Sequence, residues 1–329
     1  VEAADLTEAL TLSGDSTITV NDLETDLLAG GTAGDVIVNT DAISGDGADA
    51  ADAALEITAG TGRLRVSGDD SVDADTSTVD IAIDATSLAD GTFDERGASA
   101  IETEDADLDL LGDAEYVITN TNTSSGDEVV VDASALSASG GVALEGGGNF
   151  NFINTKQDVE APDLAGRLTV TTAEDGSGDV ITVTAGSGEL GVTASESGDA
   201  ITVESANLID TDPADDELAT GVNASGDGFE ITAGGAGAVT FNALYADVDA
   251  SALSGDLSAT IGSGTPSGFS EDVDIRLGSA DATVATNGVG VSFDAAAAGS
   301  GDTLTLSESG DVGVFNAGDG FSVSGGSDY

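Results

Sequence analysis

The chain of 329 residues contains no cysteine, histidine, methionine or tryptophan, and only six of its residues are basic. Without cysteine and histidine it cannot build the usual zinc, haem, copper or iron–sulfur sites. The same absences exclude a thiol nucleophile and a serine–histidine–aspartate triad. Lys156 is the only lysine, so the chain also lacks a Gly-x4-Gly-Lys phosphate-binding loop.

The charge of the chain is strongly one-sided. It has 63 acidic residues against 6 basic ones, a formal net charge of −57. Such a charge repels nucleic acid and anionic membranes, so neither is expected as a partner. A folded chain of this charge needs screening by concentrated salt or by divalent cations. Carboxylate, amide, hydroxyl and carbonyl oxygens remain as ligands, and these suit calcium, which we predict as the bound cation. General adaptation to salt remains the alternative explanation.

Two further absences concern location. No run of 18 apolar residues occurs, so we expect no membrane-spanning segment. The chain begins at Val1 and has no methionine, which predicts a processed product from which an export signal has been cleaved. We therefore expect an extracellular or cell-surface protein.

Short alternating runs of Val, Ile, Leu and Thr, bounded by Gly, Ser, Asn and Asp, recur along the chain. They occur at residues 16–20, 35–40, 63–67, 79–83, 128–132, 179–186 and 302–307. Alternation over four to eight residues is typical of strands separated by turns. The sequence predicts an all-β protein with many short strands, either an irregular β-solenoid or stacked β-sandwich modules. We expect two β-rich modules, residues 1–157 and 158–329.

The expected turns contain short repeated motifs with an aspartate. Ser-Gly-Asp recurs many times, usually just before an apolar run, and "VDASAL" occurs at residues 131–136 and 248–253. In both motifs we expect the aspartate carboxylate to form a hydrogen bond with the backbone just after it in the chain. We expect the small residues of "VDASAL" to form a tight corner, after which Leu returns to the core. The alternative is that these aspartates bind a cation. With two more from an acidic loop, the candidate calcium ligands are Asp84, Asp132, Asp249, Asp179, Asp199, Asp227, Asp302, Asp311, Asp210 and Asp212.

The stretches at residues 84–88, 132–136 and 249–253 carry a resemblance. Asp-Ala-Ser-Ala-Leu, or Asp-Ala-Thr-Ser-Leu in the first copy, followed by a Gly/Asp-rich turn resembles the repetitive β-regions of bacterial surface-layer proteins and large repeats-in-toxin adhesins. In those families such segments alternate with calcium-binding nonapeptides. This chain has no tandem nonapeptide array, so an ordered calcium β-roll is not implied. The resemblance implies an exported structural protein associated with a cell surface.

Three classes of function are compatible with these features. The first is an extracellular structural protein that assembles with copies of itself, as a surface-layer or filament subunit, stabilised by cations. The second is an adhesin or binding module, for example for a cell-surface polysaccharide, although no Trp and three Tyr offer little for stacking on sugars. The third is a polysaccharide-active β-helix enzyme that uses two carboxylates. We favour the first class and expect no enzymatic activity.

Overall fold

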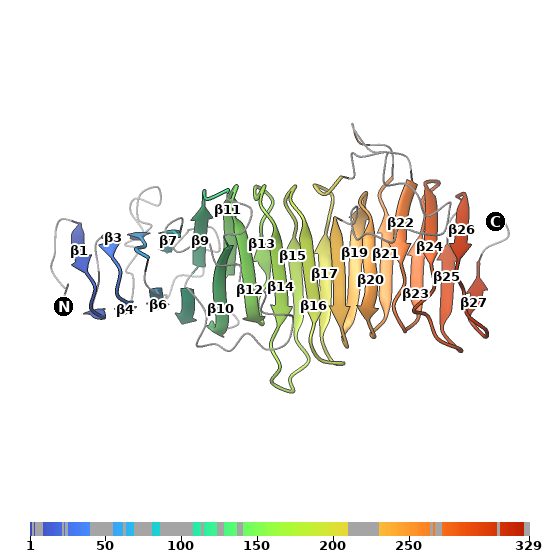
Figure 1. Ribbon diagram of the computed structural model, residues 1–329, viewed down its shortest axis with the longest axis horizontal. Coiled ribbons are helices and arrows are strands. Elements are labelled where there is room, and N and C mark those ends of the chain that lie inside the picture. The colour runs from blue at the N-terminus through green and yellow to red at the C-terminus, as the bar shows by residue number, and fades with distance from the viewer. Residues whose placement is uncertain are drawn as a thin grey trace, which may run out of the picture. The chain divides into compact units, whose positions relative to one another are not determined.

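The structure is a computed structural model, shown in Figure 1. It describes residues 1, 3, 9–21, 23, 26–39, 55–61, 64–68, 81–85, 108–112, 115–123, 128–136, 141–209, 230–263, 266, 272–307 and 310–325. These residues form strands and turns but no helix. Internal contacts divide the chain into two units, Val1–Leu168 and Thr169–Tyr329. The division expected at residue 157 stays a prediction.

In the first unit, successive strands alternate between two sheets. The odd sheet consists of β1 (Leu10–Gly14), β3 (Leu27–Thr32), β5 (Leu55–Thr58), β7 (Ile81–Asp84), β9 (Glu115–Asn120), β11 (Gly141–Gly146) and β13 (Val159–Glu160), in that order. The even sheet consists of β2 (Ile18–Asn21), β4 (Val36–Asn39), β6 (Leu64–Gly68), β8 (Leu108–Gly112), β10 (Glu128–Leu136) and β12 (Asn149–Thr155).

The second unit repeats this plan. Its odd sheet consists of β15 (Val180–Thr184), β17 (Ala200–Glu204), β19 (Ala238–Leu244), β21 (Leu257–Ile261), β23 (Ala282–Ala285), β25 (Thr303–Ser307) and β27 (Ser322–Ser324). Its even sheet consists of β14 (Leu168–Thr172), β16 (Leu190–Ala194), β18 (Ile231–Gly235), β20 (Val248–Leu253), β22 (Asp272–Arg276), β24 (Gly290–Asp294) and β26 (Val312–Phe315). β14 begins on the last residue of the first unit.

The pairing of the strands decides between the two architectures left open by the sequence. Each strand pairs in parallel with strands two positions away in the chain, as β15 does with β17 and β17 with β19. Consecutive strands lie in opposite sheets, so two of them make one rung of the stack (Figure 1). Sandwich modules are built from antiparallel hairpins instead. The all-β prediction is confirmed, and the fold is a β-solenoid.

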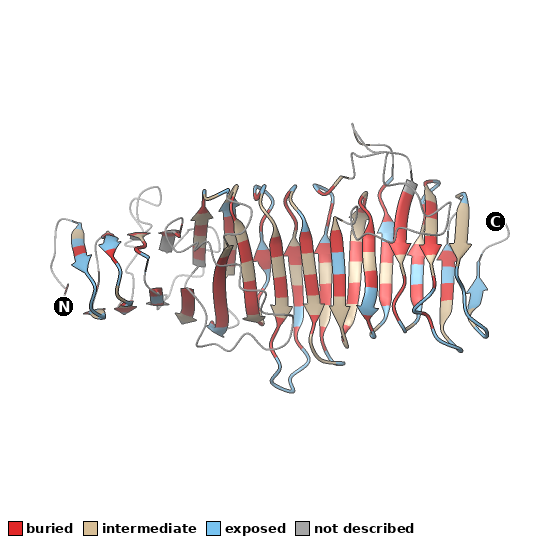
Figure 2. Ribbon diagram, in the orientation of Figure 1, coloured by how far each residue is buried: buried red, intermediate tan, exposed pale blue. Residues whose placement is uncertain are grey.

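The core lies between the two sheets and is built from columns of apolar side chains. Along each strand, buried residues alternate with residues that face outward, as the bands in Figure 2 show. In-register pairing puts like positions over one another, so Ile181, Ile201 and Val239 form one buried column. Fully buried Phe241 and Phe293 fill the core of the second unit. Burial of these columns is the main source of stability, at about 25 cal/mol for each Å² of apolar surface.

Small residues at the corners allow neighbouring rungs to approach closely. Gly146, at the end of β11, has a φ of 107°, a conformation that L side chains rarely adopt. A Cβ built on it would lie 2.2 Å from the carbonyl oxygen of Asn120 on the rung before. Glycine at the end of β11 therefore allows the two rungs to stack.

Candidate functional site

The two full copies of "VDASAL" occupy equivalent places, in strands β10 and β20 of the even sheets. In each copy the aspartate carboxylate accepts a hydrogen bond from the backbone N–H two residues on. Asp132 Oδ1 accepts from Ser134 N at 2.8 Å, and Asp249 Oδ1 accepts from Ser251 N at 2.9 Å. The predicted bonding of the aspartate to its own backbone is confirmed for both copies.

The predicted corner at this motif is wrong. The motif lies inside a strand, and the pairing register shifts between Asp132 and Ala135, and again beside β20. The small residues thus form an irregularity in the ladder, not a bend between strands. Leu136 and Leu253 are buried, as expected, and Asp132 is only 5% exposed.

The third copy of the motif is only partly described. Its aspartate, Asp84, is the last residue of β7 and lies in the odd sheet of the first unit, unlike the other two copies. Ala85 N donates a hydrogen bond to Thr119 O on the next rung. The remainder of the copy, residues 86–88, lies outside the described residues.

Two arginines in or next to the even sheets form ion pairs with carboxylates of other strands. Arg276 is in register with Asp249 on one side and Asp294 on the other. Its guanidinium lies 2.6 Å from Asp249 Oδ2 and 3.9 Å from Asp294 Oδ2. Arg167, just before β14, pairs with Glu128 of β10 at 2.8 Å, across the intervening strand β12. Since these side chains are partly buried, each pair relieves like-charge repulsion within the stack. Asp249 is therefore an ion-pair partner, which the sequence did not indicate.

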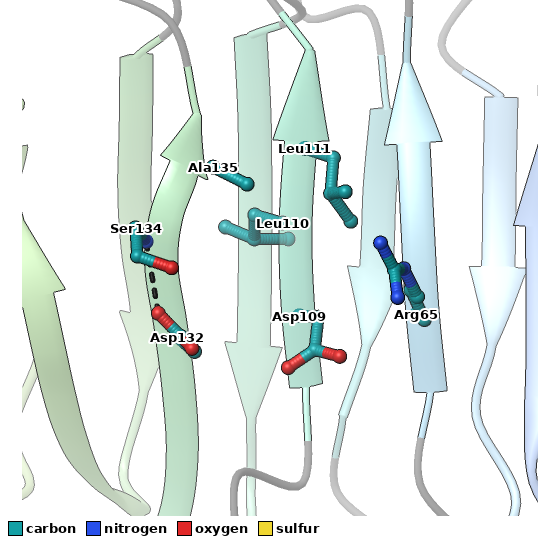
Figure 3. Close-up of a pocket in the computed structure, with 7 residues that line it drawn as sticks. All are labelled: Arg65, Asp109, Leu110, Leu111, Asp132, Ser134 and Ala135. Carbon is teal, nitrogen blue, oxygen red and sulfur yellow. Dashed lines mark hydrogen bonds between the residues drawn. The ribbon is translucent and has the colours of Figure 1, made fainter. Parts of the chain in front are cut away.

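A hollow of about 200 Å³ opens on the even sheet of the first unit. Arg65, Asp109 and Asp132 lie in register on three consecutive rungs and line it, as Figure 3 shows. Ser134 and three apolar residues complete the lining. With two carboxylates and one guanidinium, the three charged groups of the hollow sum to −1. This mixed charge is less suited to a divalent cation than the carboxylates alone would be.

The aspartates of the Ser-Gly-Asp turns stand directly before strands. Asp179, Asp199, Asp302 and Asp311 precede β15, β17, β25 and β26. Their backbone carbonyls continue the ladder, as where Asp179 O accepts from Ala200 N at 2.7 Å. The prediction that these turns start strands is confirmed for these four copies. Asp227 belongs to a Ser-Gly-Asp copy that lies outside the described residues. Asp210 and Asp212 of the acidic loop also lie outside them.

Asp199 is the most thoroughly fixed of these carboxylates. It is 2% exposed and accepts three hydrogen bonds. Thr172 Oγ1 donates to Oδ2 at 2.5 Å, Glu196 N donates to Oδ2 at 3.0 Å, and Asp179 N donates to Oδ1 at 3.0 Å. These bonds join the turn between β14 and β15 to the turn between β16 and β17, which makes the carboxylate a structural acceptor.

Replacing Asp199 with alanine is expected to lower the free energy of unfolding by about 3 kcal/mol. The change removes the carboxylate that accepts from a buried hydroxyl, a buried N–H group and a partly buried N–H group. Asp311→Ala is the matched control, because Asp311 also precedes a strand but is exposed, and it should change stability by no more than about 0.5 kcal/mol. Urea unfolding followed by circular dichroism measures both. Equal stabilities of the two variants would show that Asp199 does not hold the rungs.

The candidate calcium ligands are spread over different rungs. Asp179 and Asp199 are neighbours, whereas Asp84, Asp132 and Asp249 lie in separate strands. Among the described residues, no three acidic side chains gather into a group that could hold a metal ion.

Comparisons with protein-family models, with curated proteins and with solved structures found no match to this chain. The class that the structure defines is a β-solenoid with parallel sheets. None of the described residues belongs to a helix with the length and apolar character needed to cross a membrane.

Proposed function

We propose that the chain is an extracellular structural subunit that assembles with copies of itself, in a surface layer or a filament, and that calcium stabilises the assembly. The observation that supports this most directly is the exposure of apolar residues at core register positions on the strands β26 and β27. A cell-surface polysaccharide is the proposed anchor of such an assembly, and the proposal assigns no catalytic step to the chain.

Residues at core register positions are exposed or half-buried on β26 and β27, the last strands that the structure describes. Val323 is in register with Leu304, which is fully buried, yet Val323 is 51% exposed. Val314 of β26 is likewise only half-buried, although it is in register with the fully buried Phe293. Another strand laid beside β27 would bury this surface and pair its backbone groups.

Strand β1 is the first described strand of its sheet, and we take it as the partner of β27 in this proposal. Strand β1 has β3 as its sheet neighbour, whereas the outer side of β2 is covered by residues 1 and 3. Ala3 N donates to Asn21 O, and Asn21 N donates to Val1 O. β1 and β27 both belong to odd sheets, so β1 of one copy can extend the odd sheet of another copy in parallel at β27. A heterologous contact of this kind continues into a filament or lattice unless it closes as a ring.

Cations enter the proposal because each copy carries a formal charge of −57. Two such copies repel one another at low salt. Calcium that bridges facing carboxylates of two copies would relieve this repulsion at the contact. The ligands would then come from both copies, which is compatible with the scattered aspartates of a single copy.

Electron microscopy and light scattering of the purified chain test the proposed assembly. We expect polymers in calcium and their dissociation when a chelator is added. Particles that remain monodisperse monomers under every cation condition would contradict the proposed function.

Calcium is expected to raise the melting temperature by more than sodium chloride does at matched ionic strength. Ligand binding to the native state adds about 2.7 kcal/mol of stability when the ligand is at 100 times its dissociation constant. Magnesium at the same concentration is the control for divalent screening, since it fits irregular carboxylate sites less well. Identical melting curves in the three salts would leave only general screening and remove the calcium sites.

A further inference from the structure

The odd sheet of the second unit carries one hydroxyl residue per strand at the same register position. Each of these residues pairs directly with the next along the sheet. The column, which we name the hydroxyl ladder, consists of Thr182, Thr202, Thr240, Ser258, Thr283 and Thr305, and it ends at Ser324. All of its members are half-buried or exposed, whereas the chain neighbours on either side of the first six are buried. The ladder therefore lies on the outer face of the sheet.

The spacing of the ladder is set by the sheet. Neighbouring strands lie about 4.8 Å apart, so the hydroxyls repeat at that distance over a column about 29 Å long. At the last step, Thr305 Oγ1 and Ser324 Oγ are 3.2 Å apart and share a hydrogen bond. Six members come from the odd-numbered strands β15 to β25, and the seventh, Ser324, comes from β27. These strands follow one another in the odd sheet (Figure 1).

The ladder is uncharged in a chain of formal charge −57. On its first three strands it is bordered by Val180, Ala200 and Ala238, and Val180 is 74% exposed, the most exposed large apolar side chain among the described residues. Three acidic residues, Glu204, Asp256 and Asp281, each lie two residues from a member of the ladder. Glu204 accepts a hydrogen bond from Asn242 Nδ2 at 2.8 Å, and Asp281 accepts one from Thr303 N at 2.8 Å. The face thus combines a central column of methyl groups and hydroxyls with a border that is apolar on the first three strands and acidic at these three positions.

We propose that the hydroxyl ladder is a lateral contact between two copies of this chain, packed face to face. The inference rests on the proposed self-assembly and names a second surface for it. Two copies that are both strongly acidic meet the least repulsion where a column of each is uncharged. Two ladders have the same repeat, so threonine methyls and hydroxyls of one can pair with those of the other along the whole column. A basic partner would be drawn to the carboxylates and not to this column.

The test places charge in the ladder. The double variant Thr202→Glu with Thr240→Glu puts two carboxylates on neighbouring strands of the column. The matched control, Thr193→Glu with Thr232→Glu, makes the same change on neighbouring strands of the even sheet, also at positions that are not buried. Circular dichroism establishes that each variant is folded. Electron microscopy in calcium then measures the width of the assemblies, and sedimentation measures their mass.

The wild type and the control are expected to form paired or laterally joined filaments, whereas the ladder variant forms single filaments of unchanged length. A second measurement uses the absence of cysteine from the chain. Single cysteines placed in turn at Thr202, Thr240 and Ser258 should give disulfide-linked dimers on mild oxidation at one of these positions at least. A cysteine at Thr232 should give none.

The outcomes separate the two proposals. Wild-type filaments that stay single, or a control that loses pairing as fully as the ladder variant, contradict the lateral contact and leave the proposed function intact. Lateral dimers without filaments, lost in the ladder variant, support the contact and contradict end-to-end assembly. Monodisperse monomers contradict both. A wild type that stays unpaired but binds an insoluble neutral polysaccharide through the ladder would assign the face to that polymer and overturn the inference.

Discussion

Replacing Val323 with aspartate is expected to raise the critical concentration for assembly at least tenfold. Val323 is a half-exposed core residue of β27, the strand that we propose to pair with β1 of another copy. A carboxylate there would be desolvated in the contact without a partner, and 1.4 kcal/mol already corresponds to a factor of ten. Pelleting of the polymer over a series of protein concentrations measures the effect.

Leu28→Asp is the matched control for this variant. Leu28 is also a large apolar residue of an odd sheet and is 44% exposed, but its strand β3 has neighbours on both sides. The same change of charge there should leave the critical concentration within about twofold of the wild type, since 0.4 kcal/mol separates a factor of two. An unchanged critical concentration in Val323→Asp would remove β27 from the contact.

Phe241→Ala is expected to cost about 4 kcal/mol of the stability of the second unit. Phe241 is fully buried and lies in register between Val203 and Ala259, so truncation opens a cavity in the middle of the core column. Thr232→Ala, at an exposed position in the even sheet, should change stability by less than about 1 kcal/mol.

Urea unfolding in molar salt, followed by circular dichroism, distinguishes the two variants. The salt matters because it screens the self-repulsion of the carboxylates, so that differences in packing are measured alone. A midpoint for Phe241→Ala that equals the wild-type midpoint would mean that the columns of apolar residues do not carry the stability of the stack.

The strands were readable from the sequence because the outward and inward positions differ in chemistry. Residues 179–186 and 302–307 alternate between apolar residues and threonine or other polar residues, and both form strands of the odd sheet. Ser-Gly-Asp marks the start of such strands because glycine and aspartate suit the turn that precedes them.

The alternating pattern of the sequence could not decide between a solenoid and a sandwich. The choice depends on whether a strand pairs with the next one or with the one after it, and both arrangements bury the same alternating pattern. The chain between consecutive strands also varies in length, from two residues between β11 and β12 to 26 between β17 and β18. A solenoid tolerates insertions of this kind at its corners. The lack of a constant repeat length in the sequence is therefore compatible with a solenoid.

The candidate site was predictable only in its local part. The bonding of Asp132 to the backbone of Ser134 follows from two residues of sequence separation. The pairing of Asp249 with Arg276 joins residues 27 apart and depends on the register of β20 against β22, which no local pattern specifies. The same holds for the hydroxyl ladder, whose members become neighbours only through the parallel register.

Cryo-electron microscopy of the wild-type chain assembled in calcium tests the central claim most directly. We predict that β27 of one copy lies parallel to β1 of the next at the ordinary strand spacing of about 4.8 Å, so that the odd sheet continues from copy to copy. Density for cations is expected between facing carboxylates at this contact. Monomers in every cation condition, or an assembly in which neither β1 nor β27 takes part in a contact, would contradict the account.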